Sequence, residues 1–283
     1  MIIDRPIPFK EAIGLLQKKE LMPTTAGSAQ LQKLGAEITR QAAFSAKVTH
    51  TGFLQRAYDL INRVVNPQAL GSAPGTYMDK ARFREEMKSF LQGIGYSPEP
   101  GKAGSLQDLA SDGRLNLILD TNTQLARGYG QFLQAQDGHV LDAFPAQELY
   151  RTGNFFSKHQ RNWPTKWKDA GGHFYGGGRM IALKDDPIWS LSLDDGGFNR
   201  FGNPYPPFDY NSGMWVKPVS RDEAEAFGLL DPGEAVEPAK LDFAPGMETA
   251  VGGLAKSLQQ ALLESLGSGA QIVDGVLTIG GGS

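Results

Sequence analysis

Two stretches, GGHFYGGGRM at 171–180 and DDGGFNRFGNPYPPFDYNSG at 194–213, decide the fold class of this chain of 283 residues. Glycine, proline and aromatic residues are too dense in them for a helix or a long strand. The short apolar runs beside them, RMIALK at 179–184 and GMWVKPV at 213–219, predict β-strands. We therefore expect a loop-rich α+β region after about residue 150. The aromatic residues expected to hold it together are Trp163, Trp167, Trp189, Phe201, Phe208 and Trp215.

The preceding half of the chain has helical spacing instead. Apolar residues recur three and four positions apart, and capping residues precede several of these runs. Asp79 is the expected N-cap of one helix, and an interruption is expected at Gly113 in the longest one. The predicted helices cover residues 8–21, 28–46, 51–65, 79–92 and 105–136. The fold class is therefore α+β, with a helical N-terminal half followed by an aromatic-rich region of short strands.

The last part of the chain differs in charge from the rest. Residues 221–283 contain 3 Lys+Arg against 10 Asp+Glu, so this part is acidic. Residues 246–268 predict an amphipathic helix whose narrow apolar seam suits a partner or a second copy of the chain. After it, IVDGVLTI at 272–279 predicts a hairpin about Asp274-Gly275. We expect three regions: 1–75 (helical), 76–235 (α+β) and 236–283 (acidic tail).

Composition excludes several classes of protein. The chain has 0 cysteines, which excludes disulfide frameworks and thiolate zinc sites. No stretch approaches the ~18 consecutive apolar residues of a membrane span, and the opening residues do not resemble a signal peptide. We expect a protein that is assembled in the cytoplasm and does not enter a membrane.

The segment RTGNFFSKHQRNWPTKWK at 151–168 is the leading candidate for a binding surface. It has five basic residues, no acidic residue and four aromatic residues. Cations that neutralise phosphates, beside rings that stack on bases, are typical of nucleic-acid surfaces. The alternative is that the rings belong to the core and the cations to its solvated face. The candidate nucleic-acid residues are Arg151, Lys158, Arg161, Trp163, Lys166, Trp167 and Lys168.

Two other groups of residues are candidate sites. The glycines at 176–178 before Arg179 resemble a phosphate-binding loop, but the lysine of such loops is missing and a tight turn is favoured. Several acids and one histidine fall close together without the spacing of a known metal site, and solvated turns are favoured for them. We predict no catalytic residue, no metal ligand and no cofactor. These acids and the histidine are Asp185, Asp186, Asp194, Asp195, Asp209 and His173.

Read in order, several segments resemble the Mu F-like family of phage head morphogenesis proteins. The sharpest is RLNLILDTNTQLARGYGQF at 114–132, where Thr121 and Asn122 fit the family's I-x-x-T-N pattern. The likeness spans about residues 7–230. Other similar segments are PFKEAIGLLQKKELMPT, YMDKARFREEMKSFLQGIGY, GGGRMIALKDDPIW and FGNPYPPFDYNSGMWVKPVSRDEA. The motif residues singled out are Thr121, Asn122, Asp186, Pro187, Trp189, Pro207 and Asp209.

Two elements of the family are not found here. Its Asp-x-Arg-x-x-His segment is not legible between Tyr150 and Asp186, and Ser212-Gly213-Met214 replaces its Cys-Arg-Cys element. The resemblance implies a minor head protein of the virion that contacts the portal protein, capsid or scaffold subunits and double-stranded DNA. The alternatives left open are a metal-dependent nuclease, an ADP-ribosyltransferase-like effector and a plain DNA-binding module.

Overall fold

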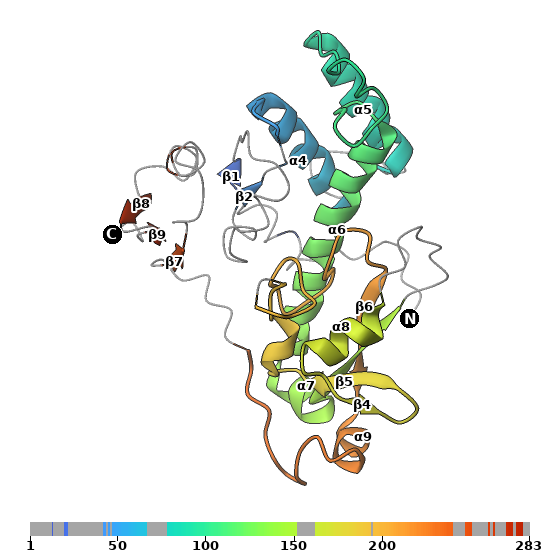
Figure 1. The fold of residues 1–283 in the computed structure, drawn as a ribbon, viewed down its shortest axis with the longest axis vertical. Helices are drawn as coiled ribbons and strands as arrows, with labels where there is room; N and C mark the ends of the chain where they lie inside the picture. The colour runs from blue at the N-terminus through green and yellow to red at the C-terminus, as the bar shows by residue number, and fades with distance from the viewer. Residues whose placement is uncertain are drawn as a thin grey trace. The chain divides into compact units, whose positions relative to one another are not determined.

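A computed structural model gives the fold, which is α+β as predicted (Figure 1). The structure describes residues 45, 47–66, 78–151, 162–193 and 195–239 and, outside these ranges, five short strands and three single helical residues. These are β1, β2, β7, β8 and β9, with Ile13, Gln260 and Leu263. The chain divides into two compact units, residues 1–127 with 243–283 and residues 128–242.

The helical part of the first unit is built by α4 (Thr51–Val65), α5 (Lys80–Gly93) and the first part of α6 (Asp112–Ala135). The predictions for 51–65 and 79–92 are confirmed. Asp79 is the N-cap of α5, because its carboxylate accepts from the backbone N–H of Arg82 at 2.8 Å. The apolar stripes of these helices meet in a core that includes Phe53, Leu54, Leu60, Ile61, Phe83, Met87, Leu91, Leu115 and Leu119.

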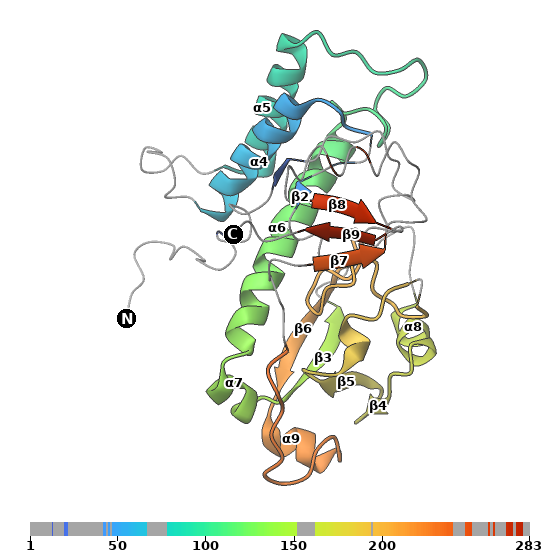
Figure 2. The ribbon, with the colours of Figure 1, turned by 90° about the vertical axis from the view of Figure 1, so that its left-hand side faces the viewer.

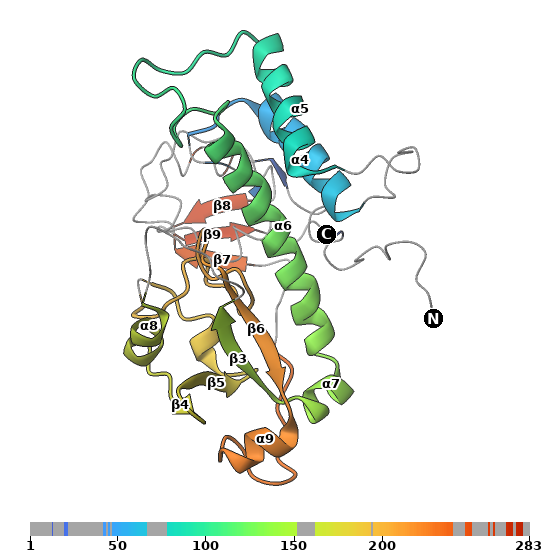
Figure 3. The same cartoon turned by 90° about the vertical axis from the view of Figure 1, so that its right-hand side faces the viewer.

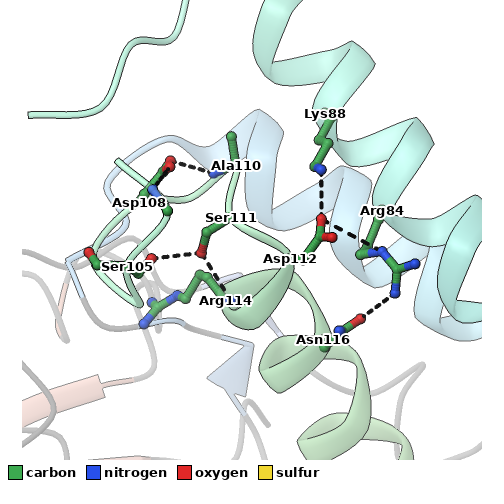
Figure 4. A network of polar contacts seen from close by, with 10 residues as sticks. Arg84, Lys88, Ser105, Asp108, Ala110, Ser111, Asp112, Arg114 and Asn116 are labelled. Carbon is green, nitrogen blue, oxygen red and sulfur yellow. Dashed lines mark hydrogen bonds and ion pairs between the residues drawn. The ribbon is translucent and has the colours of Figure 1, made fainter. Parts of the chain in front are cut away.

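Polar pairs join α5 to α6 at regular intervals. Lys80 contacts Asp120 at 2.6 Å, Arg84 donates to Asn116 at 3.0 Å, and Lys88 contacts Asp112 at 2.6 Å. Each step is four residues forward on α5 and four back on α6, which is one helical turn on two antiparallel helices. Figure 4 shows the end of this ladder at Asp112.

The predicted helix at 105–136 begins later than expected. Residues 105–111 form turns because the Asp108 carboxylate accepts from the backbone N–H groups of Gly104 and Ala110, each at 2.8 Å (Figure 4). Asp and Ser side chains bind neighbouring backbone groups in this way where a helix does not form. Gly113 lies in the first turn of α6 and does not interrupt it.

The predicted helices at 8–21 and 28–46 are wrong at Glu20–Leu21 and at Ala42–Ala43, which form strands. Glu20–Leu21 forms β1, and it pairs in parallel with β2, Ala42–Ala43. The rest of the predictions for 8–21 and 28–46 lies outside the described residues, apart from Ile13, which is helical, and Ser45, which is not.

The tail contains a three-stranded antiparallel sheet of order β7-β9-β8 (Figure 2). The hairpin is confirmed, since β8 (Ala270–Val273) and β9 (Val276–Ile279) flank Asp274-Gly275. The helix predicted from residue 246 is wrong at its start, because Met247–Ala250 forms β7 and pairs with β9. Most of 251–268, and with it the apolar seam, lies outside the described residues.

The second unit is built on a four-stranded antiparallel sheet of order β4-β5-β3-β6. Figure 3 shows β3 and β6 side by side. The predicted strands are confirmed as β5 and β6, whereas the central β3 was not predicted. The strands are β3 (Ala146–Arg151), β4 (Phe174–Tyr175), β5 (Arg179–Leu183) and β6 (Met214–Val219).

Both faces of this sheet are covered, since side chains alternate along each strand. On one face, Leu149, Met180 and Met214 pack on an aromatic cluster, defined as Trp163, Trp167, Trp189, Phe198 and Phe208. On the other, Ala146, Ile181 and Val219 pack with Leu141, Ala224, Leu230 and Val236. These residues come from loops and from α7 (Gly138–Ala143), α8 (Trp163–Asp169), the 3-10 helix η1 (Pro187–Trp189) and α9 (Arg221–Ala226).

The end of α6 that belongs to this unit lies very close to a loop. A Cβ added to Gly128 would lie 1.8 Å from the carbonyl oxygen of Pro206, so only glycine fits there. Tyr205 then packs edge-on against Tyr129, with ring centroids 5.7 Å apart. The loop that contains Pro206 is therefore held directly against the helix.

Candidate functional site

The described part of the basic segment comprises Arg151 and residues 162–168. Arg151 is the exposed last residue of β3. Asn162 caps α8 by accepting from the backbone N–H of Thr165 at 3.2 Å, and Pro164 occupies the first turn of the helix. Lys158 and Arg161 lie outside the described residues.

The two tryptophans of this segment are buried, and this corrects the expectation that they stack on bases. Trp163 is 2% exposed and Trp167 is 0% exposed. Their spacing of four residues places both on the inner side of α8. Trp167 packs on Trp189 with ring centroids 5.3 Å apart and donates its indole N–H to the carbonyl of His173 at 2.8 Å. The aromatic half of the predicted interface therefore belongs to the core.

The cations of α8 remain on its outer side. Lys168 is exposed, and Lys166 is partly buried with its Nζ 5.7 Å from the centroid of the Trp163 ring. A lysine over an aromatic face keeps its charge while its stem covers apolar surface. Lys166, Lys168 and Arg151 are thus the described members of the predicted set that can reach a phosphate.

A further arginine, Arg200, stands in the loop between η1 and β6. Its Nε contacts Oδ1 of Asp209 at 2.5 Å, and the Asp209 side chain is 2% exposed. The backbone fixes the same pair, since the N–H of Arg200 donates to the carbonyl of Phe208 at 2.8 Å. Sequence analysis missed Arg200 because it lies outside the basic segment.

A short chain of contacts links this pair to the end of β3. The backbone N–H of Ser212 donates to the carbonyl of Asp209 at 3.2 Å, and the Ser212 hydroxyl accepts from the backbone N–H of Met214. Met214 is the register partner of Arg151. The fold therefore brings Arg200 to the same end of the sheet as Arg151.

The loop itself is held by Asn199, which is 0% exposed. Its side-chain oxygen accepts from the backbone N–H groups of Phe201 and Gly202 at 2.9 and 3.0 Å. Its side-chain nitrogen donates to the carbonyls of Trp189 and Asn203 at 2.7 and 2.5 Å. All four hydrogen bonds go to the backbone, so one buried amide fixes the path of the loop.

The motif residues lie where they hold the fold. Asn122 on α6 accepts from the hydroxyl of Tyr58 on α4 at 2.7 Å, and Thr121 beside it is partly buried. Pro207 follows a cis peptide bond after Pro206. Thr121 and Asn122 belong to the first unit, and the other motif residues belong to the second.

The Asp-Pro-Ile-Trp segment forms a compact corner. Asp186 caps η1, with Oδ1 accepting from the backbone N–H of Ile188 at 2.8 Å, and Pro187 occupies the first turn. Trp189 is 0% exposed and donates its indole N–H to the carbonyl of Leu183 at 2.7 Å. The corner thus joins the end of β5 to the aromatic cluster.

The residues considered for metal binding are engaged separately or exposed. Asp195 accepts from the Ser192 hydroxyl at 2.5 Å, while Asp185 and His173 are exposed. Within the described residues no group of three or more His, Cys, Asp or Glu side chains is placed to hold a metal ion. Asp194 lies outside the described residues.

The glycines at 176–178 form the turn between β4 and β5, and all three have positive φ angles. Strand β5 follows this turn directly, so no helix N-terminus supports an anion there. The predicted tight turn at these glycines is therefore confirmed.

Strand β3 carries a buried glutamate that sequence analysis missed. Glu148 contacts Arg179 of β5 at 2.6 Å and Lys217 of β6 at 3.1 Å, so one carboxylate joins three neighbouring strands. Arg179 also bonds Glu223 of α9. Glu223, with Glu148 next, raises the pKa of Arg179, and Arg179 lowers the pKa of Glu223. This network fastens α9 to the sheet.

Comparison with known proteins adds no relative. No family model, curated protein or solved structure matches the chain. Among the described residues, no helix is long and apolar enough to cross a membrane.

Proposed function

We propose that this chain is a minor head protein of a tailed phage, of the Mu F-like head morphogenesis kind. Its role is to bind the portal protein and capsid or scaffold subunits while the head assembles in the bacterial cytoplasm, and to contact the packaged double-stranded DNA. The family comes from the resemblance in residues 7–230. The geometry of the motif residues supports it.

One observation carries the proposal: the motif side chains make contacts inside the protein that hold its helices and loops in place. Asn122 joins α4 to α6, Trp189 anchors the corner after β5, and Asp209 holds Arg200. Each is a contact that fixes backbone or a neighbouring side chain. A protein that acts by presenting a fixed surface to other subunits needs its loops held in this way, because ordering them on binding would cost affinity.

Co-expression with the portal protein of the same phage genome tests the proposal. The chain is expected to co-purify with the portal protein and to appear in purified heads at low copy number by quantitative mass spectrometry. A folded chain that stays monomeric and is absent from heads would contradict it. Residues 243–283 can be deleted in a parallel sample to learn whether the tail takes part in the contact.

The enzymatic alternative has its own outcome. If Asp209 were a nuclease ligand, DNA cleavage with magnesium or manganese would be seen and would be lost in Asp209→Asn. We expect no such cleavage, because the Asp209 carboxylate is buried against Arg200. Metal-dependent cleavage that disappears in this variant would replace the proposal with a nuclease.

A further inference from the structure

Arg200 differs from Arg179 and Arg221, the other described arginines of its unit that pair with acidic residues. Arg179 binds two carboxylates, and Arg221 bonds the carboxylate and carbonyl of Asp142 and the carbonyl of Glu234. Arg200 uses only its Nε, toward Asp209. No described residue accepts a hydrogen bond from its two terminal amino groups, and 26% of its side chain is exposed.

The buried partner gives this guanidinium a fixed direction. An arginine has five N–H donors in a planar fork, so one bond at Nε holds the plane and leaves the two terminal groups for a second ligand. The Asp209 side chain is nearly inaccessible, and its Oδ1 also accepts from the backbone N–H of Tyr210 at 2.8 Å. The entropy of holding the arginine is therefore already lost in the folded protein.

The charge around this end of the sheet suits a polyanion. Arg151, exposed at the end of β3, is linked to the Arg200–Asp209 pair through Ser212 and Met214. Phe198, two residues before Arg200, packs against Trp163, over which Lys166 lies. Planar guanidinium groups match the oxygens of a phosphate in a bidentate manner.

We propose that Arg200 is a phosphate-binding residue for the backbone of double-stranded DNA, and that Asp209 is its positioning residue. This inference deepens the proposed function and rests on it for the choice of DNA as the partner. It places the DNA contact in the second unit, where β3 ends at Arg151. The tryptophans of α8 belong to the core.

The test measures the affinity of the full-length chain for a DNA duplex in chloride buffer from low to moderate salt. Each phosphate contact contributes about 0.9 to the slope of log affinity against log salt. Arg200→Gln is expected to lower that slope by about 0.9. Lys102→Gln, which removes a partly buried charge from a loop of the first unit, is the matched control and is expected to leave the slope unchanged.

Two further variants separate position from charge. Arg200→Lys keeps the charge and loses the fork, so the slope is expected to stay while affinity falls several-fold. Asp209→Asn makes the chain more positive, and a pure charge effect would tighten binding, whereas loss of positioning weakens it. Thermal unfolding of every variant checks that the fold is kept.

Three results would overturn the inference: no measurable DNA binding by the wild type, an Arg200→Gln slope equal to wild type, or tighter binding by Asp209→Asn. A separate titration with inorganic phosphate distinguishes a small-anion site, which would show an Arg200-dependent signal there and none with DNA. Portal co-purification is measured independently, so failure of the DNA contact and failure of the assembly role are distinguishable.

Discussion

The hydroxyl of Tyr58 on α4 donates to the side-chain oxygen of Asn122 on α6 at 2.7 Å. Tyr58 is 6% exposed, and Asn122 in turn donates to the carbonyl of Ile118 at 2.9 Å. The bond therefore connects two helices and the backbone of one of them within the core of the first unit. A buried hydroxyl without a partner is costly, so this bond should matter for stability.

The first prediction concerns this bond. Asn122→Ala should lower the free energy of unfolding by about 1–3 kcal/mol, because it leaves the buried hydroxyl unpaired. Tyr58→Phe should cost less than that, and the double variant less than the sum of the two. Urea unfolding of the four proteins measures the coupling. Gln131→Ala, at an exposed position of the same helix, is the control, and equal losses for it and Asn122→Ala would contradict the assignment.

The second prediction compares two glycines of α6. Gly128→Ala should destabilise strongly, since its Cβ would meet the Pro206 carbonyl at 1.8 Å and the loop must move. Gly113→Ala should stabilise by about 0.5–1 kcal/mol, because its nearest neighbour, Leu106 Cδ2, is 3.5 Å away and alanine favours the helix. Thermal unfolding compares them. Similar effects of the two changes would mean that the helix does not approach the loop as described.

The third prediction concerns Lys184, a residue that is 4% exposed and whose Nζ lies 3.4 Å from the carbonyl oxygen of Ala135. Burial lowers the pKa of Lys184 from 10.5 to about 8. Between these two values the unfolded chain binds more protons than the folded one, so this residue makes stability rise with pH across that window. Below pH 8 it carries a constant penalty, about 1.4 kcal/mol for each unit of pKa shift.

Lys184→Met should therefore be more stable than wild type at pH 7, by at most about 3 kcal/mol. The advantage should shrink as pH rises from 8 toward 10 and the wild type gains. Urea unfolding at several pH values measures this difference. A difference in the free energy of unfolding between Lys184→Met and wild type that stays constant with pH would show that the amine is not desolvated in the folded protein. A variant that is less stable than wild type at pH 7 would show the same.

The fourth prediction uses the four tryptophans of the chain. Trp163, Trp167 and Trp189 are at most 2% exposed, whereas Trp215 is partly exposed on β6. Acrylamide should therefore quench the fluorescence of Trp215 and not that of the other three tryptophans. In Trp215→Phe the quenchable fluorescence should be lost, and the remaining fluorescence should resist quenching. Added DNA should leave the three buried emitters unchanged. Strong quenching that survives in the variant would place a buried tryptophan at the surface.

Local signals explain what could be predicted of the fold. The helix after Asp79 was predictable because the capping residue and the apolar spacing that follow it are both local. The hairpin about Asp274-Gly275 was predictable for the same reason. In both cases the sequence favours one backbone conformation before any distant contact forms.

Distant contacts explain the failures. In β3, Gln147 and Glu148 are buried polar residues, and Glu148 is accommodated only because Arg179 and Lys217 come from neighbouring strands. Met247–Ala250 has the spacing of a helix, but its pairing with β9 decides its conformation. No local pattern contains either partner.

The same difference between local signals and distant contacts applies to the candidate site. The basic segment was found from composition, yet which of its members face solvent depended on α8 packing on the aromatic cluster. Arg200 has no signal of its own in the sequence. The loop places it against Asp209, nine residues away, and no local pattern indicates that contact.

The ladder between α5 and α6 sets how these helices can change in evolution. Lys80, Arg84 and Lys88 meet Asp120, Asn116 and Asp112, respectively. Inserting one residue in α5 between Lys80 and Arg84 would rotate Arg84 and Lys88 by about 100° relative to Lys80, so the three pairs could no longer form together. The connecting turns at 94–111 lie outside this constraint. Length variation among relatives of this chain should therefore be concentrated in those turns and be rare within either helix.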